Sequence, residues 1–151
     1  MTSRYNDGMD SLTFLDKIDT LEAEPVYAVH GDEGFLKRQV IVALRRKFFG
    51  DDPEPFDYSS YPGDKAVWSS IHDELRTLPF VSPRRMVVID AADPFVSQNR
   101  AALEKYVAAP AGRGTLVLEV KTWTATTKLA KALGQSCAIT CKAPPTARLA
   151  G

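Results

Sequence analysis

Two features of this chain contain residue types that could perform chemistry on a nucleotide. One is the loop His30–Lys37, which reads His-Gly-Asp-Glu-Gly-Phe-Leu-Lys and follows a run of β-forming residues. The other is Asp90, which ends the apolar run Met86–Ile89. A glycine-containing loop after a strand can hold phosphates, and an acid at the end of an apolar strand can hold magnesium. With Lys37 on phosphate and Asp90 on magnesium, the chain would be a nucleotide-binding ATPase.

The loop departs from the pattern that such chemistry needs. A phosphate-binding loop has the form GxxxxGK[ST], which is absent, and Gly31–Gly34 does not match GxGxxG either. The acids Asp32 and Glu33 would lie beside the phosphates and raise the electrostatic cost of binding them. Acids at this position are typical of the first turn of a helix, where Asp32 can act as the cap.

Asp90 is also a weak indicator of an ATPase. The second acid that would activate water is missing, because Ala91 and Ala92 follow directly and the next acid is Asp93. The simpler interpretation is that Asp90 and Asp93–Pro94 form a turn.

Other catalytic or metal-binding arrangements are not indicated. His30 and His72 are the only histidines, and no GxSxG motif accompanies them. Cys137 and Cys141 lie beside no histidine cluster, so they fit neither a zinc site nor a disulfide framework. We expect reduced, structural thiols in a cytoplasmic protein, with no cofactor and no metal.

Charge balance limits the partners that the chain can bind. Lysine and arginine total 19, as do aspartate and glutamate, so there is no overall basic field for nucleic acid. A DNA-binding module that uses Arg45, Arg46 and Lys47 is an alternative, but short basic runs such as these and Arg84–Arg85 are typical of solvated faces. Trp68 and Trp123 are expected to pack rather than to stack on bases.

Length and hydropathy indicate a single globular domain. The 151 residues are 44% hydrophobic, and a chain of this size can bury ~70% of its unfolded surface. No apolar run approaches the ~20 residues of a membrane span, and the polar start, Met1–Asp10, does not resemble a signal peptide.

Apolar runs alternate along the chain with longer amphipathic segments. The runs predict five strands, at residues 25–30, 56–61, 85–89, 115–120 and 136–140. Helical spacing predicts helices at residues 34–49, 68–78, 103–107 and 128–133. Helix-length crossovers imply a parallel sheet covered on both faces, which is a three-layer α/β sandwich. The apolar strand 25–30 should be central, and the more polar strand 56–61 should lie at an edge.

The ends of the chain differ from this middle part. Residues 1–24 form an extension that can add a helix through Leu12, Phe14, Leu15 and Ile18. Residues 25–141 hold the α/β domain. Residues 142–151 contain two prolines and no periodicity, as in a linker to C-terminal domains that this chain lacks.

An apolar cluster lies where a polar turn would be expected. Leu78, Pro79, Phe80 and Val81 follow a helical stripe that Pro79 should end, and they precede the strand Arg85–Ile89. Such a cluster is either a corner of the core or a surface that waits for a partner. We expect Phe80 to be exposed.

The order of these motifs is similar to that of a known family. Segments 26–33, 75–80 and 84–89 come first, followed by 92–95, 115–119 and 127–133. In this order they resemble the N-terminal domain of the delta subunit of the bacterial DNA polymerase III clamp loader, over residues 25–140.

The resemblance implies an AAA+-like domain, with the topology of a P-loop NTPase but without the phosphate loop. It implies a non-catalytic subunit that binds and opens the ring-shaped sliding clamp (beta) for loading onto primed DNA. The matching clamp-binding residues are Leu78, Pro79, Phe80 and Val81. Because Pro79 stands where some members carry a second large apolar residue, Leu78 is the alternative partner of Phe80.

The resemblance also implies further partners. The family's lid and collar domains, which join the other clamp-loader subunits, have no counterpart in these residues, and primer-template DNA is a partner only in the full complex. The main alternative is a degenerate nucleotide-binding ATPase domain that uses Lys37 and Asp90.

Overall fold

Six parallel strands form one sheet at the centre of the molecule. The computed structural model describes residues 9–134 and 137–142. The strands are β1 (Met9–Asp10), β2 (Val26–His30), β3 (Tyr58–Pro62), β4 (Arg85–Asp90), β5 (Gly114–Val120) and β6 (Ala138–Thr140). The helices are α1 (Ser11–Lys17), α2 (Gly34–Phe49), α3 (Trp68–Arg76), α4 (Asp93–Gln98), α5 (Arg100–Ala108) and α6 (Lys128–Leu133). The strand order is β1-β6-β2-β5-β4-β3, and every neighbouring pair is parallel.

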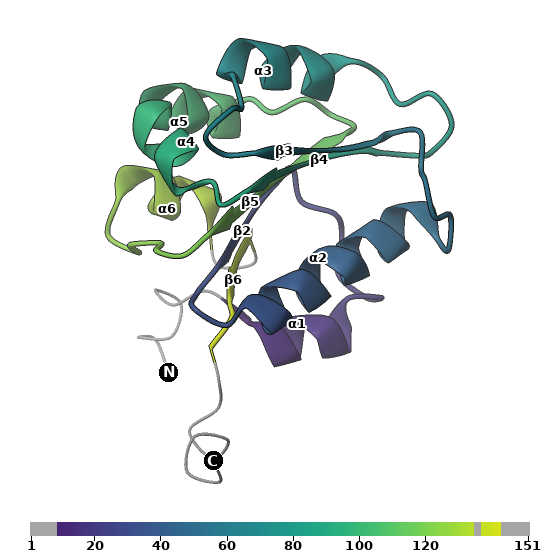
Figure 1. Ribbon diagram of the computed structural model, residues 1–151, viewed down its shortest axis with the longest axis horizontal. Helices are drawn as coiled ribbons and strands as arrows, with labels where there is room; N and C mark the ends of the chain where they lie inside the picture. Colours follow the sequence, from purple (N-terminus) through teal and green to yellow (C-terminus); the bar gives the residue numbers. More distant parts are fainter. Residues whose placement is uncertain (1–8, 135–136, 143–151) are drawn as a thin grey trace, which may run out of the picture.

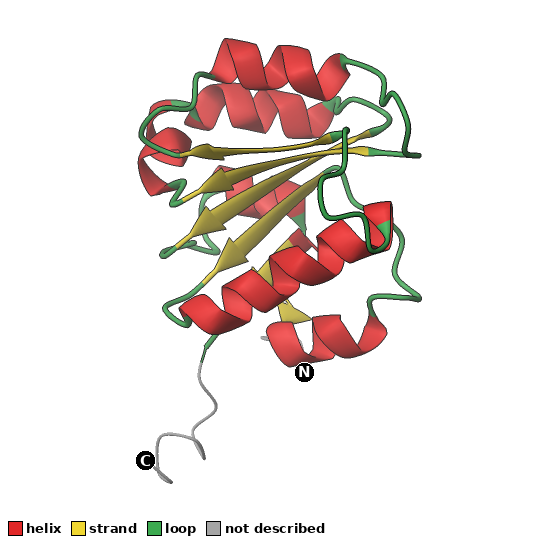
Figure 2. Ribbon diagram, turned by 45° about the vertical axis from the view of Figure 1, so that its right-hand side comes forward, coloured by secondary structure: helices red, strands yellow, loops and turns green. Residues whose placement is uncertain are grey.

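Helices cover both faces of the sheet. Helices α1 and α2 lie on one face, and α3 to α6 lie on the other (Figure 1). Along β4, Val87 and Ile89 belong to the core under α3 to α6, whereas Met86 and Val88 belong to the core under α1 and α2. Successive side chains of a strand point to opposite faces, so a strand buried on both faces must be apolar throughout. The predicted three-layer α/β class is confirmed, and the parallel strands are seen together in Figure 2.

The predicted order within the sheet is confirmed in two respects. Strand β2 lies in the interior between β6 and β5, and β3 lies at an edge. The predicted number of strands is wrong by one, because β1 pairs with β6 at the opposite edge. Two residues, Met9 and Asp10, are too few to show a periodic pattern.

The N-terminal segment belongs to the same layered structure. Helix α1, which the apolar residues between Leu12 and Ile18 predicted, begins after Asp10, whose carboxylate caps it. Phe14 is 1% exposed, and its ring lies edge-on to Tyr27 of β2, with 5.9 Å between ring centroids. Of the C-terminal predictions, Ser136 and residues 143–151 lie outside the described residues.

Several boundaries differ from the predictions for local reasons. Glu33, not Asp32, caps α2, and its carboxylate accepts the N–H of Phe35 at 3.2 Å. Asp93–Pro94 begin α4 instead of completing a turn, and Pro94 suits this position because a helix's first turn needs no N–H.

The strand and helix that flank the apolar cluster are also shifted. Strand β3 begins at Tyr58 instead of Phe56, because Phe56 and Asp57 form a turn in which the N–H of Tyr58 donates to the carbonyl of Pro55 at 3.4 Å. Helix α3 ends at Arg76, two residues before Leu78, with Thr77 in extended conformation. Pro79 disfavours helical geometry at the residue before it, so the apolar cluster leaves the helix and becomes a loop.

Candidate functional site

The apolar loop, defined here as Leu78–Val81, presents large side chains to solvent. Leu78, Phe80 and Val81 are 69%, 76% and 72% exposed. The loop joins α3 to β4, so it lies at the amino end of the sheet. The predicted exposure of Phe80 is confirmed. Apolar side chains gathered in this way on one loop are typical of a binding surface.

Phe56 extends this surface, although the sequence predicted it as the start of a strand. Its side chain is 67% exposed, and its ring centroid lies 5.1 Å from that of Phe80, with the planes tilted by 48°. Aromatic pairs at such distances attract each other beyond their buried area. The only signal in the sequence is the proline-rich loop that precedes Phe56, which made an interior strand position less suitable.

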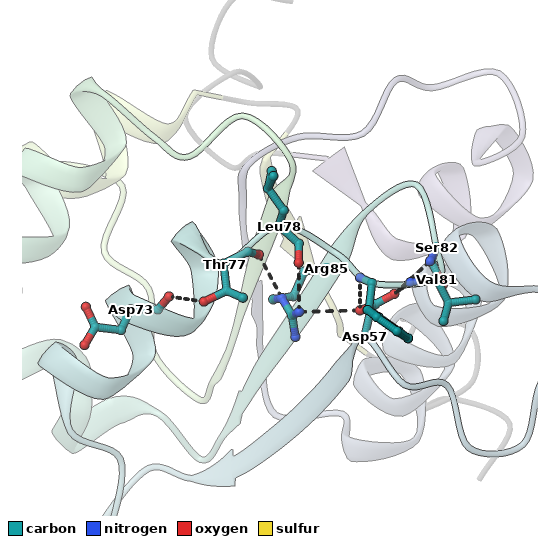
Figure 3. Close-up of polar contacts among 8 residues, drawn as sticks. Asp57, Asp73, Thr77, Leu78, Val81, Ser82 and Arg85 are labelled. Carbon is teal, nitrogen blue, oxygen red and sulfur yellow. Dashed lines mark hydrogen bonds and ion pairs between the residues drawn. The ribbon is translucent and has the colours of Figure 1, made fainter.

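The backbone of the loop is held by one buried carboxylate. Asp57 accepts the N–H groups of Phe80, Val81 and Ser82, at 2.6, 2.8 and 2.7 Å. Figure 3 shows these bonds between the start of β3 and the loop. The side chain of Asp57 is fully buried. The backbone N–H groups of three consecutive loop residues are therefore hydrogen-bonded to a side chain of the protein and not to water.

Arg85, the first residue of β4, holds the carbonyl groups of the same segment. Its Nε donates to the carbonyl of Thr77 at 3.0 Å, and its Nη2 donates to that of Leu78 at 3.2 Å. Nη2 also lies 3.4 Å from Asp57 Oδ1 (Figure 3). Arg85 is 8% exposed, so the expectation that Arg84–Arg85 is a solvated pair is wrong for Arg85. Its charge is compensated by Asp57, as burial requires.

The electrostatics of Asp57 follow from these contacts. Burial acts to raise the pKa of its carboxyl, but the hydrogen bonds from the three loop amides and the charge of Arg85 outweigh burial and lower it below its ordinary value. A carboxylate that accepts several N–H groups stays ionised because those bonds favour its charged form. The loop is therefore held by an ionised Asp57 at neutral pH.

The groups of the ATPase alternative lie at the opposite, carboxyl end of the sheet. Lys37 Nζ forms an ion pair with Glu119 Oε2 at 2.7 Å and donates to the carbonyl of Val120 at 3.3 Å. Glu119 Oε1 accepts the N–H of Ala91 at 2.7 Å. Lys37 is 8% exposed. The lysine that the alternative places on phosphate thus has partners within its own chain.

Asp90 lies in the same region without contacting Lys37 through any bond that the structure records. A cavity of about 340 Å³ here is lined by residues of α2 and three strands, among them Lys37, Arg38, Arg45, Tyr58, Asp90 and Glu119. Burial, and then the charge of Glu119, raise the pKa of Asp90. Both causes favour the protonated form of the Asp90 carboxyl.

The glycine of the loop after β2 has a packing role. Gly31 has φ of +129°, and a Cβ built on it would lie 2.1 Å from the carbonyl oxygen of Cys141. The N–H of Glu33 donates to that same carbonyl at 3.3 Å. In a phosphate-binding loop, amides of this kind point at the phosphates. Here the loop closes on the end of β6.

The remaining candidate residues are engaged within the fold. His72 stacks on Trp68 with 5.0 Å between ring centroids. Of the basic run, Arg45 donates to the carbonyl of Pro53 at 2.7 Å, and Lys47 donates to that of Ile18 at 2.9 Å. Arg46 forms an exposed ion pair with Asp51 at 3.7 Å, so each residue of this run has a partner within the fold.

The cysteines, the possible metal-binding groups and the helices add three further findings. Cys137 and Cys141 are buried and form no disulfide, as predicted, and burial raises the pKa of Cys141 to about 11. In residues 9–134 and 137–142, no group of three acids, histidines or cysteines could hold a metal ion. No helix among the described residues is long and apolar enough to span a membrane.

The parallel sheet with helices on both faces defines a three-layer α/β domain, and the loop after β2 packs against Cys141 and lacks the GxxxxGK[ST] pattern of a phosphate-binding loop. The family model "DNA polymerase III, delta subunit" matches residues 27–142, which is most of the chain. The chain therefore belongs to the family of DNA polymerase III delta subunits, as its motif order suggested. No curated protein sequence matches the chain.

Two solved structures have the same fold. The Bacillus subtilis DNA clamp loader delta protein is 23% identical, with a TM-score of 0.72 over 88% of this chain and 42% of its own. A DNA polymerase III gamma subunit-related protein from Thermotoga maritima is 18% identical, with a TM-score of 0.65 over 92% of this chain and 48% of its own. This chain thus spans less than half the length of either structure.

Proposed function

We propose that this chain binds the ring-shaped sliding clamp through the apolar loop and holds the ring open while it is loaded onto primed DNA. The observation that supports this most strongly is the exposure of Leu78, Phe80 and Val81 on a loop whose backbone is fixed from within. Membership of the delta-subunit family and the likeness to a protein named a clamp loader delta protein support the choice of partner.

The chemistry of the loop suits an anchor in an apolar pocket. Buried aromatic residues at the centre of an interface commonly supply most of its binding energy. Phe80 would insert as this anchor, with Leu78 beside it, while Pro79 is half-buried and shapes the loop. Phe56 would widen the contact through its ring contact with Phe80.

Opening of the ring needs no covalent chemistry in this chain. A ligand shifts a conformational equilibrium by the difference between its affinities for the two states. A rigid apolar loop that fits the clamp better when one ring interface is open would stabilise the open form. We therefore propose a non-catalytic subunit that works without a nucleotide, metal or other cofactor of its own.

The other proposed partners would not be bound by this domain directly. Contacts with the remaining clamp-loader subunits would be made by C-terminal domains in a longer protein, with residues 142–151 as the linker. Primer-template DNA would be met only in the assembled complex. The cytoplasm is the compartment in which such a complex would act.

The ATPase alternative predicts that the chain binds Mg-ATP, whereas our proposal predicts that it does not. Because Lys37 is paired with Glu119 and Gly31 packs on Cys141, we expect no binding of Mg-ATP to the chain. Isothermal titration calorimetry tests this directly, and a micromolar dissociation constant would restore the alternative.

The proposal is tested by Phe80→Ala, with Phe35→Ala as the matched control. Phe35 is also exposed, at 60%, but it lies at the other end of the sheet, at the start of α2. Loss of a central aromatic anchor should weaken clamp binding by ~2 kcal/mol or more, roughly thirtyfold. The melting temperature should barely change in either variant, and Phe35→Ala should bind normally.

The same experiment can contradict the proposal. If Phe80 packs as a core residue in solution, its removal would cost about 3–5 kcal/mol of stability. A large fall in melting temperature, with clamp affinity of the folded fraction unchanged, would show that the loop is not the binding site.

A further inference from the structure

We propose that Asp57 and Arg85 are positioning residues for clamp binding, which fix the apolar loop in its binding conformation before the partner arrives. This inference rests on the proposed function, because it says how the same loop is prepared. Neither residue is offered as a contact with the clamp, since both are buried. They would act through the backbone of residues 77–82.

The contacts of Asp57 are directed at the loop. Oδ1 accepts the N–H of Phe80, and Oδ2 accepts those of Val81 and Ser82. Its remaining side-chain partner is Arg85, which bonds the carbonyls of Thr77 and Leu78. The pair therefore holds donors and acceptors on both sides of Pro79.

Both carboxylate oxygens are needed for this arrangement. In the variant Asp57→Asn, one oxygen would be replaced by an NH₂ group, which donates and does not accept. If the NH₂ group replaced Oδ2, it would face the amides of Val81 and Ser82. If it replaced Oδ1, it would face the amide of Phe80 and the Arg85 guanidinium. Either orientation leaves buried donors without an acceptor.

Asp57 also connects the two parts of the apolar surface. Phe56, its neighbour in the sequence, lies against Phe80, so one residue fixes the backbone beside both rings. Without this hold, the chain would have to order the loop and bring the rings together as it bound. Such ordering lowers affinity, whereas a binding segment fixed beforehand avoids the loss.

The first test measures loop order without any clamp. Amide hydrogen exchange of Phe80, Val81 and Ser82 should be slow in the wild-type chain, although the side chains are exposed. In Asp57→Asn it should be faster by about tenfold or more. Asp73→Asn is the matched control, because the Asp73 carboxylate is exposed on α3 and pairs only with Arg76 among the described contacts. Equal exchange in wild type and Asp57→Asn would overturn the inference.

The second test measures clamp affinity in the folded fraction. We expect Asp57→Asn to bind about tenfold more weakly than wild type, and Asp73→Asn to bind normally. A positioning residue acts through the anchors, so the effect of Asp57→Asn should be smaller when Phe80 is already alanine. A purely structural residue would lower the melting temperature without this coupling. An undiminished effect in the double variant would overturn the inference.

The two tests separate this inference from the proposed function. If wild type does not bind the clamp while loop exchange depends on Asp57, the proposed function fails and only the ordering of the loop stands. If wild type binds and Phe80→Ala does not, but exchange at the three amides is fast in wild type, the binding site stands and the positioning role fails. This last measurement needs no variant, so it remains decisive even if Asp57→Asn does not fold.

Discussion

At the carboxyl end of the sheet Lys37 and Glu119 bind each other and nearby backbone, whereas at the amino end Asp57 and Arg85 bind the backbone of a loop whose side chains face solvent. Both ends contain a pair of opposite charges, in which Lys37, Asp57 and Arg85 are buried and Glu119 is partly buried. At the carboxyl end the pair joins strand, helix and loop. At the amino end the pair supports a surface. The difference shows that a buried ion pair reveals little about function until its neighbours are examined.

The largest expected effect is a loss of stability when the ion pair at the carboxyl end of the sheet is broken. Glu119→Gln leaves the buried Lys37 ammonium without its counter-charge, while the amide oxygen can still accept the N–H of Ala91. A buried charge that loses its partner is costly, so we expect a loss of about 3 kcal/mol in the free energy of unfolding. Urea denaturation measures it. Clamp affinity of the folded fraction should be unchanged.

The matched control replaces the whole pair. Lys37→Met combined with Glu119→Gln removes the unpaired charge and should recover much of the stability. If Glu119→Gln alone weakened clamp binding as much as Phe80→Ala, the separation of the two ends would be wrong.

A smaller effect is expected when pH acts on the amino end. The folded-state pKa of Asp57 is lowered, so its stabilisation is fully present above the unfolded value of about 4 and is lost as pH falls through the folded value. The stability difference between wild type and Asp57→Asn should therefore be constant near neutral pH and shrink in acid. Urea denaturation of both proteins across this range measures it. A difference that grew in acid would contradict the role of the ionised carboxylate.

The smallest effect sharpens the boundary of the binding surface. Phe56→Ala removes a ring that contacts Phe80 but lies outside the apolar loop. We expect a loss of about 1 kcal/mol of clamp-binding free energy, or roughly fivefold, because an aromatic pair contributes about this much. Surface plasmon resonance with immobilised clamp measures it. An effect as large as that of Phe80→Ala would make Phe56 an anchor in its own right.

Much of the fold could be predicted because its signals are local. Strands β2, β4 and β5 are buried on both faces, so each is a continuous apolar run. Helix α4 escaped prediction because its Asp93–Pro94 start is equally typical of a turn. Strand β1 escaped because its partner, β6, lies at the other end of the chain.

Part of the candidate site could also be predicted from local signals, and part could not. Exposure of Phe80 could be predicted, because an apolar cluster at a turn is visible in the sequence. The hydrogen bonds that fix the loop backbone could not be predicted, since Asp57 and Arg85 are 28 residues apart and meet because β3 and β4 are paired. Arg85 adjoins Arg84 in the sequence, and a pair of arginines gives no sign that one of them is buried.

The close approach of Gly31 to Cys141 affects how sequence variation at this position should be interpreted. Any substitution would place a side-chain carbon against the carbonyl that ends β6, in a backbone conformation that other residues rarely adopt. Natural selection would therefore retain glycine here to keep the strands joined, whether or not any ancestor used this loop to hold phosphate. An invariant glycine at position 31 would therefore be explained by packing alone, and would not by itself indicate an earlier phosphate-binding role.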